Sequence, residues 1–443
     1  METELAKTKT INNYFDYLTS YLVKDENLEG ISVPTSFGVN DAGLNSLITQ
    51  LVEIQIKKNI LIDGGQVNNP AINQYNRQSK QLALNLQEAI NTKVDRYDHG
   101  VLKEFASSLL TASGMEPSKS AVIADVLLEG DLLGHDTHGL QLLAPYLSDI
   151  KSGAMATHGE PRVISDLPAA IAWDGKRLPG TWLTSKALDL AINRAEIYGT
   201  CTVTIAGGHH IACLAAYLLK ATEKNMVAII MTSAPENKSV APYGGKTGTL
   251  TPNPIAAGWP TDDLPVLIDV STSITTNGMV GRTAKSEEKL SGPWLIDHNG
   301  KPTNDPSVMT SEPSGALLPI GGLEYGHKGF ALGLLVEALT QGLSGHGRAD
   351  LVDAWTGEVF LQVLNPVLFG GISQFVRQTS WITEACRNST SVNPDSPVRI
   401  PGQQGIKKRQ QQMHHGVALH PSIMPALITW AQEKGVDMPS SIK

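Results

Sequence analysis

The sequence is poor in cysteine, in long hydrophobic runs and in positive charge. Its three cysteines, Cys201, Cys213 and Cys386, show no C-x-x-C spacing, which predicts neither disulfides nor a zinc cage and favours a reducing, cytoplasmic compartment. No apolar stretch reaches the ~18 residues that a membrane helix needs, and the polar first ten residues lack the core of a signal peptide. A net charge of −8 and a pI near 5.8 argue against nucleic-acid binding. No membrane and no nucleic-acid partner is therefore expected.

Standard catalytic signatures are absent as well. No G-x-G-x-x-G follows a strand-like run, and the chain has neither a P-loop lysine motif nor H-E-x-x-H. The sequence thus predicts no Rossmann dinucleotide-binding domain and offers no standard zinc-hydrolase signature.

The composition is that of a large globular protein with two or three domains. The chain has 443 residues, of which 41% are hydrophobic and 18% charged. Composition changes near residue 95, since all seven tryptophans lie beyond it and only Pro34 and Pro70 precede it. We expect a helical segment over residues 1–92 and an α/β domain over 93–443.

The first segment predicts a helical hairpin. Apolar residues recur at helical spacing over Leu44–Ile54 and again over Ile72–Ala89, with a break at Asp63-Gly64-Gly65. Residues 30–72 resemble the coiled-coil region of bacterial exopolysaccharide chain-length regulators. Because the transmembrane helices of those proteins are missing, we interpret the segment as a fusion, natural or constructed, that contributes no chemistry.

From Arg96 onward the pattern alternates between helices and strands. Helices are predicted near Val101–Leu110, Ser118–Leu133, Ile211–Ala221, Gly329–Leu343 and Pro425–Lys434, and strands at Cys201–Ile205, Val227–Thr232 and Val266–Val270. Gly134 predicts the end of the second helix. We divide this part into a helical opening part (about 96–155), a cofactor-binding α/β core (about 156–350) and a closing part (about 351–443).

The first candidate site is Gly134-His135-Asp136-Thr137-His138-Gly139, between two predicted helices. Thr137 is the expected N-cap of the helix that begins near Leu140, which puts His138 at a helix N-terminus. The positive end of the helix dipole favours a neutral imidazole there, able to accept a proton. The alternative is a polar loop with capping residues and no chemistry.

Two further glycine-rich stretches carry reactive side chains. Gly207-Gly208-His209-His210 follows a strand and precedes a helix expected from Ile211, a place where a pyrophosphate could bind. His327 and Lys328 lie at the expected start of another helix, where a lysine suits an anionic phosphate or carboxylate. A tight turn with exposed histidines and a solvated lysine are the respective alternatives.

These stretches, taken in order, resemble one family over about Tyr97–Pro439. The matching blocks are GHDTHGLQLLAPYL, GGHHIACL, MTSAPENKSVAPYGG, PNPIAAGWP, DVSTS, GHKGFALGLLVE, PVRIPG and HGVALHPSIMPAL. The family includes malate, L-lactate, L-sulfolactate and ureidoglycolate dehydrogenases, diketogulonate reductase and cyclic imino-acid reductases. The resemblance implies a mixed, non-Rossmann α/β fold like that of L-sulfolactate dehydrogenase, a homodimer, and hydride transfer between NAD or NADP and a small 2-hydroxy or 2-oxo acid.

The resemblance also implies roles for individual residues. His138 matches the proton donor and acceptor, and Thr137 stands where a serine is usual. His210 matches a second histidine, assigned to cofactor contact in some members and to proton transfer in others. The cofactor-contact segments correspond to His210, Ile211, Ala212, Cys213 and Leu214; to Asp269, Val270 and Ser271; to His327 and Lys328; and to Gly402, Gln403 and Gln404. The choice between NAD and NADP, and between His138 and His210 as principal acid–base, stays open.

The sequence departs from the family pattern at several positions. Leu142 stands where many members have a substrate-binding arginine, and Thr251-Pro252-Asn253-Pro254 replaces G-T-N-P. Met279 replaces the aspartate proposed to orient the catalytic histidine in imino-acid reductases, and Gln403 stands where glutamate is common. These changes leave the fold and cofactor class in place and the identity of the hydroxy acid open.

Two other functions compete with this one. A metal-assisted hydrolase would use His135, Asp136, His138, His209 and His210 as ligands. A non-catalytic relative would bind nicotinamide without turnover, in keeping with the changes at Leu142 and Met279. The dehydrogenase prediction itself includes no metal.

Overall fold

In the computed structural model, residues 42–66, 69–91, 95–286, 288–350, 352, 354–393 and 396–442 are described. The chain divides into two units. One comprises Met1–Arg96, Ala418–Pro425 and Ser441–Lys443, and the other comprises Tyr97–Val417 and Ala426–Ser440. No helix in the described part of the chain combines the length and the hydropathy that a bilayer span requires.

The first unit contains the expected helical hairpin. Helices α2 (Ala42–Asp63) and α3 (Pro70–Asn91) contact each other, and the chain turns at Gly64 and Gly65. Leu44, Ile48 and Leu51 are buried on α2, and Leu86 is buried on α3. The helical spacing of these residues explains why one face of each helix is apolar. Residues 30–41, the first part of the stretch that resembles chain-length regulators, lie outside the described residues.

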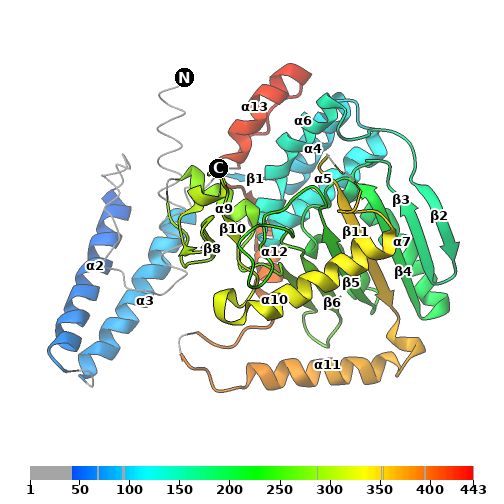
Figure 1. Cartoon of the computed structure of the whole chain (residues 1–443). Helices are drawn as coiled ribbons and strands as arrows, with labels where there is room; N and C mark the ends of the chain where they lie inside the picture. Colours follow the sequence, from blue (N-terminus) through cyan, green and yellow to red (C-terminus); the bar gives the residue numbers. More distant parts are fainter. Residues whose placement is uncertain are drawn as a thin grey trace. The chain divides into compact units, whose positions relative to one another are not determined.

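The remaining helices and strands follow the alternation that the sequence indicates (Figure 1). The helices are α4 (His99–Ala112), α5 (Pro117–Leu133), α6 (Leu143–Ser152), α7 (Gly180–Tyr198), α8 (Ala215–Thr222), α9 (Asn277–Lys285), α10 (Gly322–Glu337), α11 (Ile372–Arg387), α12 (Gln403–His415) and α13 (Ile423–Lys434). The strands are β1 (Arg96–Tyr97), β2 (Arg162–Leu167), β3 (Ala170–Asp174), β4 (Thr200–Gly208), β5 (Val227–Ser233), β6 (Ile255–Trp259), β7 (Val266–Val270), β8 (Leu295–Ile296), β9 (Pro302–Thr303), β10 (Ala316–Leu317), β11 (Gly357–Leu364) and β12 (Val417–Ala418).

The central sheet of the second unit has the order β2-β3-β4-β11-β5-β6-β7. Only β3 and β4 pair in parallel, through the crossover helix α7, and the other neighbouring strands pair antiparallel. A doubly wound dinucleotide fold needs a mostly parallel sheet. The fold is therefore mixed α/β and not Rossmann, as expected.

Both faces of the sheet are buried at its central strands. Phe360 on β11 and Met231 on β5 pack with Val336 of α10. Leu361 and Val363 point to the opposite face, because side chains alternate along a strand, and they are buried as well. Helices α7 and α8 pack on the sheet, α7 against β4 and β11 and α8 against β5 and β6. Burial on both faces accounts for the apolar runs of the central strands.

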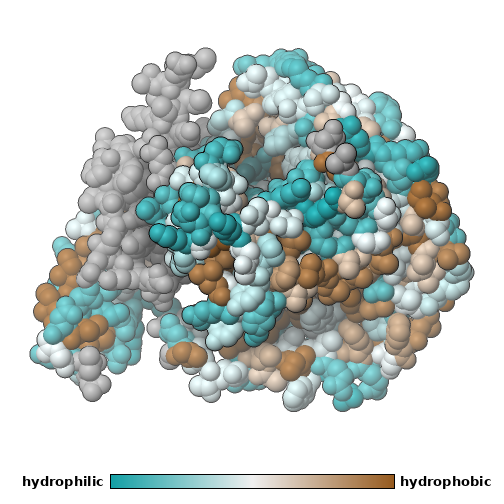
Figure 2. Space-filling model, in the orientation of Figure 1, coloured by the Kyte–Doolittle hydropathy of each residue, from teal (hydrophilic) through white to brown (hydrophobic). Residues whose placement is uncertain are grey.

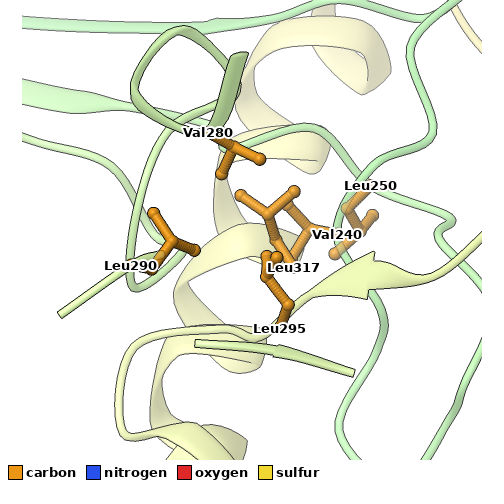
Figure 3. Close-up of a cluster of buried hydrophobic side chains, with 6 residues drawn as sticks. All are labelled: Val240, Leu250, Val280, Leu290, Leu295 and Leu317. Carbon is orange, nitrogen blue, oxygen red and sulfur yellow. The ribbon is translucent and has the colours of Figure 1, made fainter. Parts of the chain in front are cut away.

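A second, smaller sheet has the order β10-β8-β9 and carries its own core. Figure 3 shows this cluster, formed by Val240, Leu250, Val280, Leu290, Leu295 and Leu317. Val280 lies on α9 and Leu295 on β8. The cluster therefore fixes α9 to the small sheet.

Candidate functional site

His138 lies in the connection between α5 and α6. Helix α5 ends at Gly134, whose φ of 90° is the left-handed conformation that glycine adopts readily at a helix end. A 3₁₀ turn, η3 (Asp136–His138), follows. The prediction that Thr137 is a helix N-cap is wrong, because Thr137 lies inside this turn and α6 begins only at Leu143. Its hydroxyl instead lies 2.9 Å from Nδ1 of His138.

A buried carboxyl group holds the loop behind His138. The backbone N–H of Leu140 donates to Oδ2 of Asp131 at 2.7 Å. Burial raises the pKa of Asp131 to about 8, so this side chain is largely protonated at neutral pH. A Cβ atom at Gly139 would collide with the Asp131 carboxyl. Only glycine therefore fits beside His138 in this position.

His210 follows the end of β4 in a strained turn. Gly207 and Ala212 have φ values of 55° and 60°, and Ala212 is a residue that rarely adopts this conformation. The N–H of Ala212 donates to Nδ1 of His210 at 3.3 Å, and the Tyr146 hydroxyl lies 2.9 Å from the same nitrogen. A nitrogen that accepts a backbone N–H carries no proton, so these partners assign the proton of neutral His210 to Nε2.

The structure brings the two histidine rings together. Their centroids are 6.0 Å apart and their planes are 30° from parallel. Burial lowers the pKa of His138 below its ordinary value and lowers the pKa of His210 well below its ordinary value. In both cases burial is the largest cause of the shift. Asp269 and Asp136 act in the opposite direction on His138, whereas His138 and His209 lower the pKa of His210 further. Both rings are therefore predominantly neutral at neutral pH.

The five candidate metal ligands do not bring their ligand atoms together at one point. His209 is 1% exposed, and its Nε2 lies 2.9 Å from Oδ2 of Asp149. Within the described ranges, the one group of metal-type ligands whose atoms approach one another within 4.8 Å is His135, Cys213 and Asp269. It contains a single member of the five-residue set that the hydrolase hypothesis requires. The geometry does not support that hypothesis.

The expected cofactor segments meet around β7. Asp269 accepts the N–H of Ala215 at 2.9 Å, and Sγ of Cys213 lies 3.6 Å from the same carboxylate oxygen. The prediction of a helix from Ile211 is wrong, since α8 begins at Ala215 after the left-handed Ala212. The Asp269 carboxylate therefore lies at the N-terminus of α8, the helix at whose start the sequence suggested a pyrophosphate. The residues Ile211, Ala212, Cys213 and Leu214 are buried.

The start of α12 lies against the same strand. Leu267 on β7 donates its N–H to the carbonyl of Pro401 at 3.2 Å, and a Cβ at Gly402 would collide with Leu267. Gln403 accepts the N–H of Ile400 through its side chain at 3.3 Å, and Gln404 is exposed. At the end of β7, Val270 is exposed, and the hydroxyl of Ser271 donates to the carbonyl of Ser273 at 2.7 Å.

His327 and Lys328 lie in the second turn of α10, because this helix begins at Gly322 and not at the predicted position. Both side chains are exposed. The ring of His327 lies 5.5 Å from that of Tyr243, and Nζ of Lys328 lies 5.5 Å from the ring of Tyr325. The neighbouring Gly329 packs close to the carbonyl of Thr272, which ties this helix to the segment after β7.

Three residues of the site were not expected from the sequence. Tyr146, on α6, is fully buried and bonds to His210. The ring of Trp355 lies 4.6 Å from that of His210. Arg282, on α9, lies 3.2 Å from Asp136 and donates to Gln141 at 2.8 Å. Tyr146 lies in the same block as His138, so its presence there was the available signal. Trp355 and Arg282 are brought in from distant parts of the chain.

Comparisons with known proteins agree with this arrangement. The family model described as malate/L-lactate dehydrogenase matches residues 97–428. The chain is 30% identical to a malate dehydrogenase of Pyrococcus abyssi over 344 residues, which cover 76% of the chain and 94% of that protein. It is 29% identical to a malate/(S)-sulfolactate dehydrogenase of Methanothermus fervidus over 340 residues, or 74% and 95%.

A solved structure and a further sequence relative lead to the same family. The structure of malate dehydrogenase from Pyrococcus horikoshii superposes with a TM-score of 0.70 at 28% identity, covering 78% of this chain and 97% of that one. Hydroxycarboxylate dehydrogenase B of Escherichia coli O157:H7 is 27% identical over 351 residues, or 77% and 95%. Sequence and fold agree over the region that holds both histidines and the segments around β7. The chain therefore belongs to the malate/L-lactate dehydrogenase family.

Proposed function

We propose that this protein transfers a hydride between NAD(P) and the 2-carbon of a small 2-hydroxy or 2-oxo acid, with His138 as proton donor and acceptor. NAD(P) is the cofactor of the family to which the chain belongs. The observation that carries the proposal is the pair of neutral, neighbouring histidines with different hydrogen-bond partners. Oxidation of a hydroxyl needs a base for its proton while hydride leaves carbon, and a neutral imidazole is suited to this role.

His138 is the better proton carrier of the two. Its Nδ1 donates to the Thr137 hydroxyl in the tautomer that leaves Nε2 free as a base. After proton uptake, the charge is stabilised by Asp269 and Asp136, which both favour the protonated ring. Thr137 orients the ring through the whole cycle, since its oxygen accepts from Nδ1 in both protonation states.

His210 acts as a fixed hydrogen-bond donor. Its Nδ1 is occupied by the Ala212 N–H and the Tyr146 hydroxyl, so its Nε2–H is available for an acceptor on the substrate or cofactor. Its strongly lowered pKa keeps it neutral through turnover. A donor that stays protonated at Nε2 can polarise a carbonyl without exchanging its proton.

The residues around β7 fit a nicotinamide dinucleotide. When bound, this group supplies or accepts the hydride. Lys328 is an exposed cation suited to a phosphate, and the exposed Val270 offers an apolar contact at the end of β7. In this proposal, backbone groups of Gly402, Gln403 and Gln404, together with Ser271, would provide further polar contacts for this group.

We also propose that the protein forms a homodimer. We further propose that it works in a reducing, cytoplasmic compartment. Figure 2 shows hydrophobic residues at the surface over α10, and this exposed set comprises Leu323, Tyr325, Leu332, Leu334 and Leu335. Apolar patches of this kind are typical of subunit interfaces. The three cysteines are free, which agrees with a reducing environment.

Residues 1–92 take no part in the chemistry in this proposal. His138, His210 and every proposed cofactor segment lie within Tyr97–Val417. Turnover by a folded protein that lacks residues 1–92 should match that of the full chain. Loss of turnover with the fold retained would assign a role to the helical segment.

The test of the function is a fluorescence titration of the full chain with NADH and with NADPH, followed by reduction assays on a panel of 2-oxo acids and cyclic imines. Saturable binding with turnover of a 2-oxo acid is the expected result, and the titration also decides between the two cofactors. Binding without turnover would favour the non-catalytic relative. Absence of binding by the folded protein would contradict the proposal.

A further inference from the structure

A 2-oxo acid carries a carboxylate directly beside its reacting carbonyl. A residue that binds this carboxylate must therefore lie close to His138, and a cationic donor binds it most strongly. Position 142, four residues after His138, is an uncharged leucine. The charged groups that act on His138 are His135 and Asp136 on its own loop, Asp269 on β7 and Arg282 on α9. Arg282 is the permanent cation among them.

Helix α9 is held firmly against the His138 loop. The Thr276 side chain caps the helix by accepting the N–H of Met279, and Val280 is buried in the core cluster shown in Figure 3. A Cβ at Gly278 would lie 3.5 Å from the Cβ of Thr137, so the first turn of α9 lies against the residue before His138. Arg282 follows one turn later on a helix that cannot move without disturbing this core.

The guanidinium of Arg282 spans the loop on both sides of His138. Its Nη1 lies 3.2 Å from Oδ2 of Asp136, and its Nη2 donates to Oε1 of Gln141 at 2.8 Å. Its Nε is buried without a hydrogen-bond partner among the described residues. A guanidinium has five N–H groups, so these two bonds leave N–H groups on both Nη atoms available. The side chain is 22% exposed, which leaves it accessible to a small anion.

Another cation near this loop is less suitable. Lys408, on α12, lies over Gly134, where a Cβ would be 3.2 Å from its Nζ. Its charge acts on Asp131 and is not among the charges that act on His138. Lys408 is an exposed side chain and serves as a matched control.

We propose that Arg282 binds the carboxylate of the substrate and so fixes the 2-oxo group beside His138. The inference rests on the proposed function, since it assigns the specificity residue of the same site. Asp136 and Gln141 orient the guanidinium, and the fork of parallel N–H groups matches the two carboxylate oxygens. The substrate class is thereby restricted to small 2-oxo and 2-hydroxy acids with a free carboxylate.

The test compares two inhibitors in the enzyme–NADH complex by quenching of nicotinamide fluorescence. Oxamate mimics a 2-oxo acid and carries the carboxylate, whereas oxamide is its neutral counterpart. In Arg282→Gln we expect the Kd of oxamate to rise about 10- to 100-fold, the usual effect of losing charged hydrogen bonds. The Kd values of oxamide and NADH should stay within about twofold, because neither uses a carboxylate contact at Arg282. Arg282→Lys should restore part of the oxamate affinity, and Lys408→Gln should leave it unchanged.

The variant Asp136→Asn distinguishes carboxylate binding by Arg282 from a role of Arg282 in supporting the His138 loop. This variant breaks the ion pair but keeps the cation, so oxamate should bind as well as before or more tightly. The acid limb of the pH–kcat profile should move to higher pH in Arg282→Gln and to lower pH in Asp136→Asn, because these charges act on His138 in opposite directions.

Equal losses of oxamate and oxamide binding in both variants would mean that Arg282 only supports the loop, and the inference would be wrong. Unchanged oxamate binding in Arg282→Gln, or no oxamate binding to a wild-type complex that binds NADH, would also overturn it. Failure of the wild type to bind NADH would instead remove the proposed function and the inference with it.

Discussion

The His138 loop and the His210 turn carry the same kind of residue in opposite hydrogen-bonding states. His210 is restrained at Nδ1 by a backbone N–H and a buried hydroxyl, and its ring packs 4.6 Å from that of Trp355. Among the described residues, the His138 side chain has one hydrogen-bond partner, the Thr137 hydroxyl, and His138 lies in a 3₁₀ turn. A residue that moves protons needs a free nitrogen, whereas one that orients a ligand needs its other nitrogen fixed. In the proposed function, this difference gives the two histidines different tasks.

The charges around the two rings also favour protonation of His138 over protonation of His210. Carboxylates at Asp269 and Asp136 favour protonation of His138, while the groups that act on His210 are histidines that oppose it. Protonation is therefore accessible to His138 and strongly disfavoured at His210.

A buried carboxyl group supports each of the two segments. Asp131 accepts the Leu140 N–H behind His138, and Glu358 accepts the Gly207 N–H before His210 at 3.0 Å. Burial raises the pKa of both, to about 8 and to about 7. Glu358 also lies 3.0 Å from Nδ1 of His346. At neutral pH the Asp131 carboxyl is therefore mainly protonated, whereas that of Glu358 is close to half ionised.

The largest predicted effect comes from removing the proton carrier. His138→Ala should lower kcat by roughly 10²–10⁴, the usual contribution of a positioned acid–base, while the Kd of NADH changes little. Steady-state kinetics in both reaction directions measure this. Near-normal kcat in His138→Ala, with a large loss in His210→Ala, would reverse the assignment of the two histidines.

The next effect concerns the restraint on His210. Tyr146→Phe removes the hydroxyl beside Nδ1 but keeps the buried ring, so kcat should fall about 10-fold, in line with the net worth of one hydrogen bond. The pH dependence of kcat should keep its shape, since His210 does not titrate in this account. A change in the acid limb of the profile would show that His210 exchanges protons.

Lys328 should affect the cofactor and not the proton. Lys328→Ala is expected to raise the KM of NAD(P)H about 3- to 10-fold, as for one exposed charged contact, with kcat nearly unchanged. Lys408→Ala is the control for a general loss of charge. Equal KM values in wild type and Lys328→Ala would remove Lys328 from the cofactor site.

The smallest effects are on stability. The folded-state pKa values of Asp131 and Glu358 lie above their ordinary values of 3.8 and 4.5. Their contribution to stability is therefore present at low pH and is lost as pH rises through about 8 for Asp131 and about 7 for Glu358. Stability declines between the ordinary pKa and the raised pKa of each group, so Asp131→Asn should flatten the decline of Tm between about pH 4 and pH 8, and Glu358→Gln should flatten it between about pH 4.5 and pH 7. Parallel Tm curves for wild type and both variants would contradict buried, protonated acids.

Local patterns predicted much of the fold. Strand β7 has the predicted bounds, and α5 ends at Gly134 as expected, because alternation, helical periodicity and a C-terminal glycine are encoded locally. The start of α8 was missed because it depends on Ala212 in a left-handed conformation, which alanine seldom adopts. Thr137 was taken for a cap because its position before an apolar run matches capping preferences.

Long-range arrangement was beyond the sequence patterns. Strand β11 comes from the expected closing part, yet it lies between β4 and β5 in the centre of the sheet. Arg282 reaches the His138 loop from a helix 144 residues further along the chain, and its role depends on tertiary packing of Val280. Both histidines were found from their glycine-rich surroundings, but their different hydrogen bonds depend on Tyr146 and on the backbone of a single turn.

The central claim is hydride transfer at the carbon beside the substrate carboxylate. The direct measurement uses NADH or NADPH carrying deuterium at both hydrogen positions of nicotinamide C4, incubated with the enzyme and a 2-oxo acid, and NMR of the product. The account predicts a 2-hydroxy acid with deuterium at C2 and loss of this product in His138→Ala. A product without deuterium at C2, or a wild-type enzyme that binds the reduced cofactor but leaves every 2-oxo acid unchanged, would contradict it.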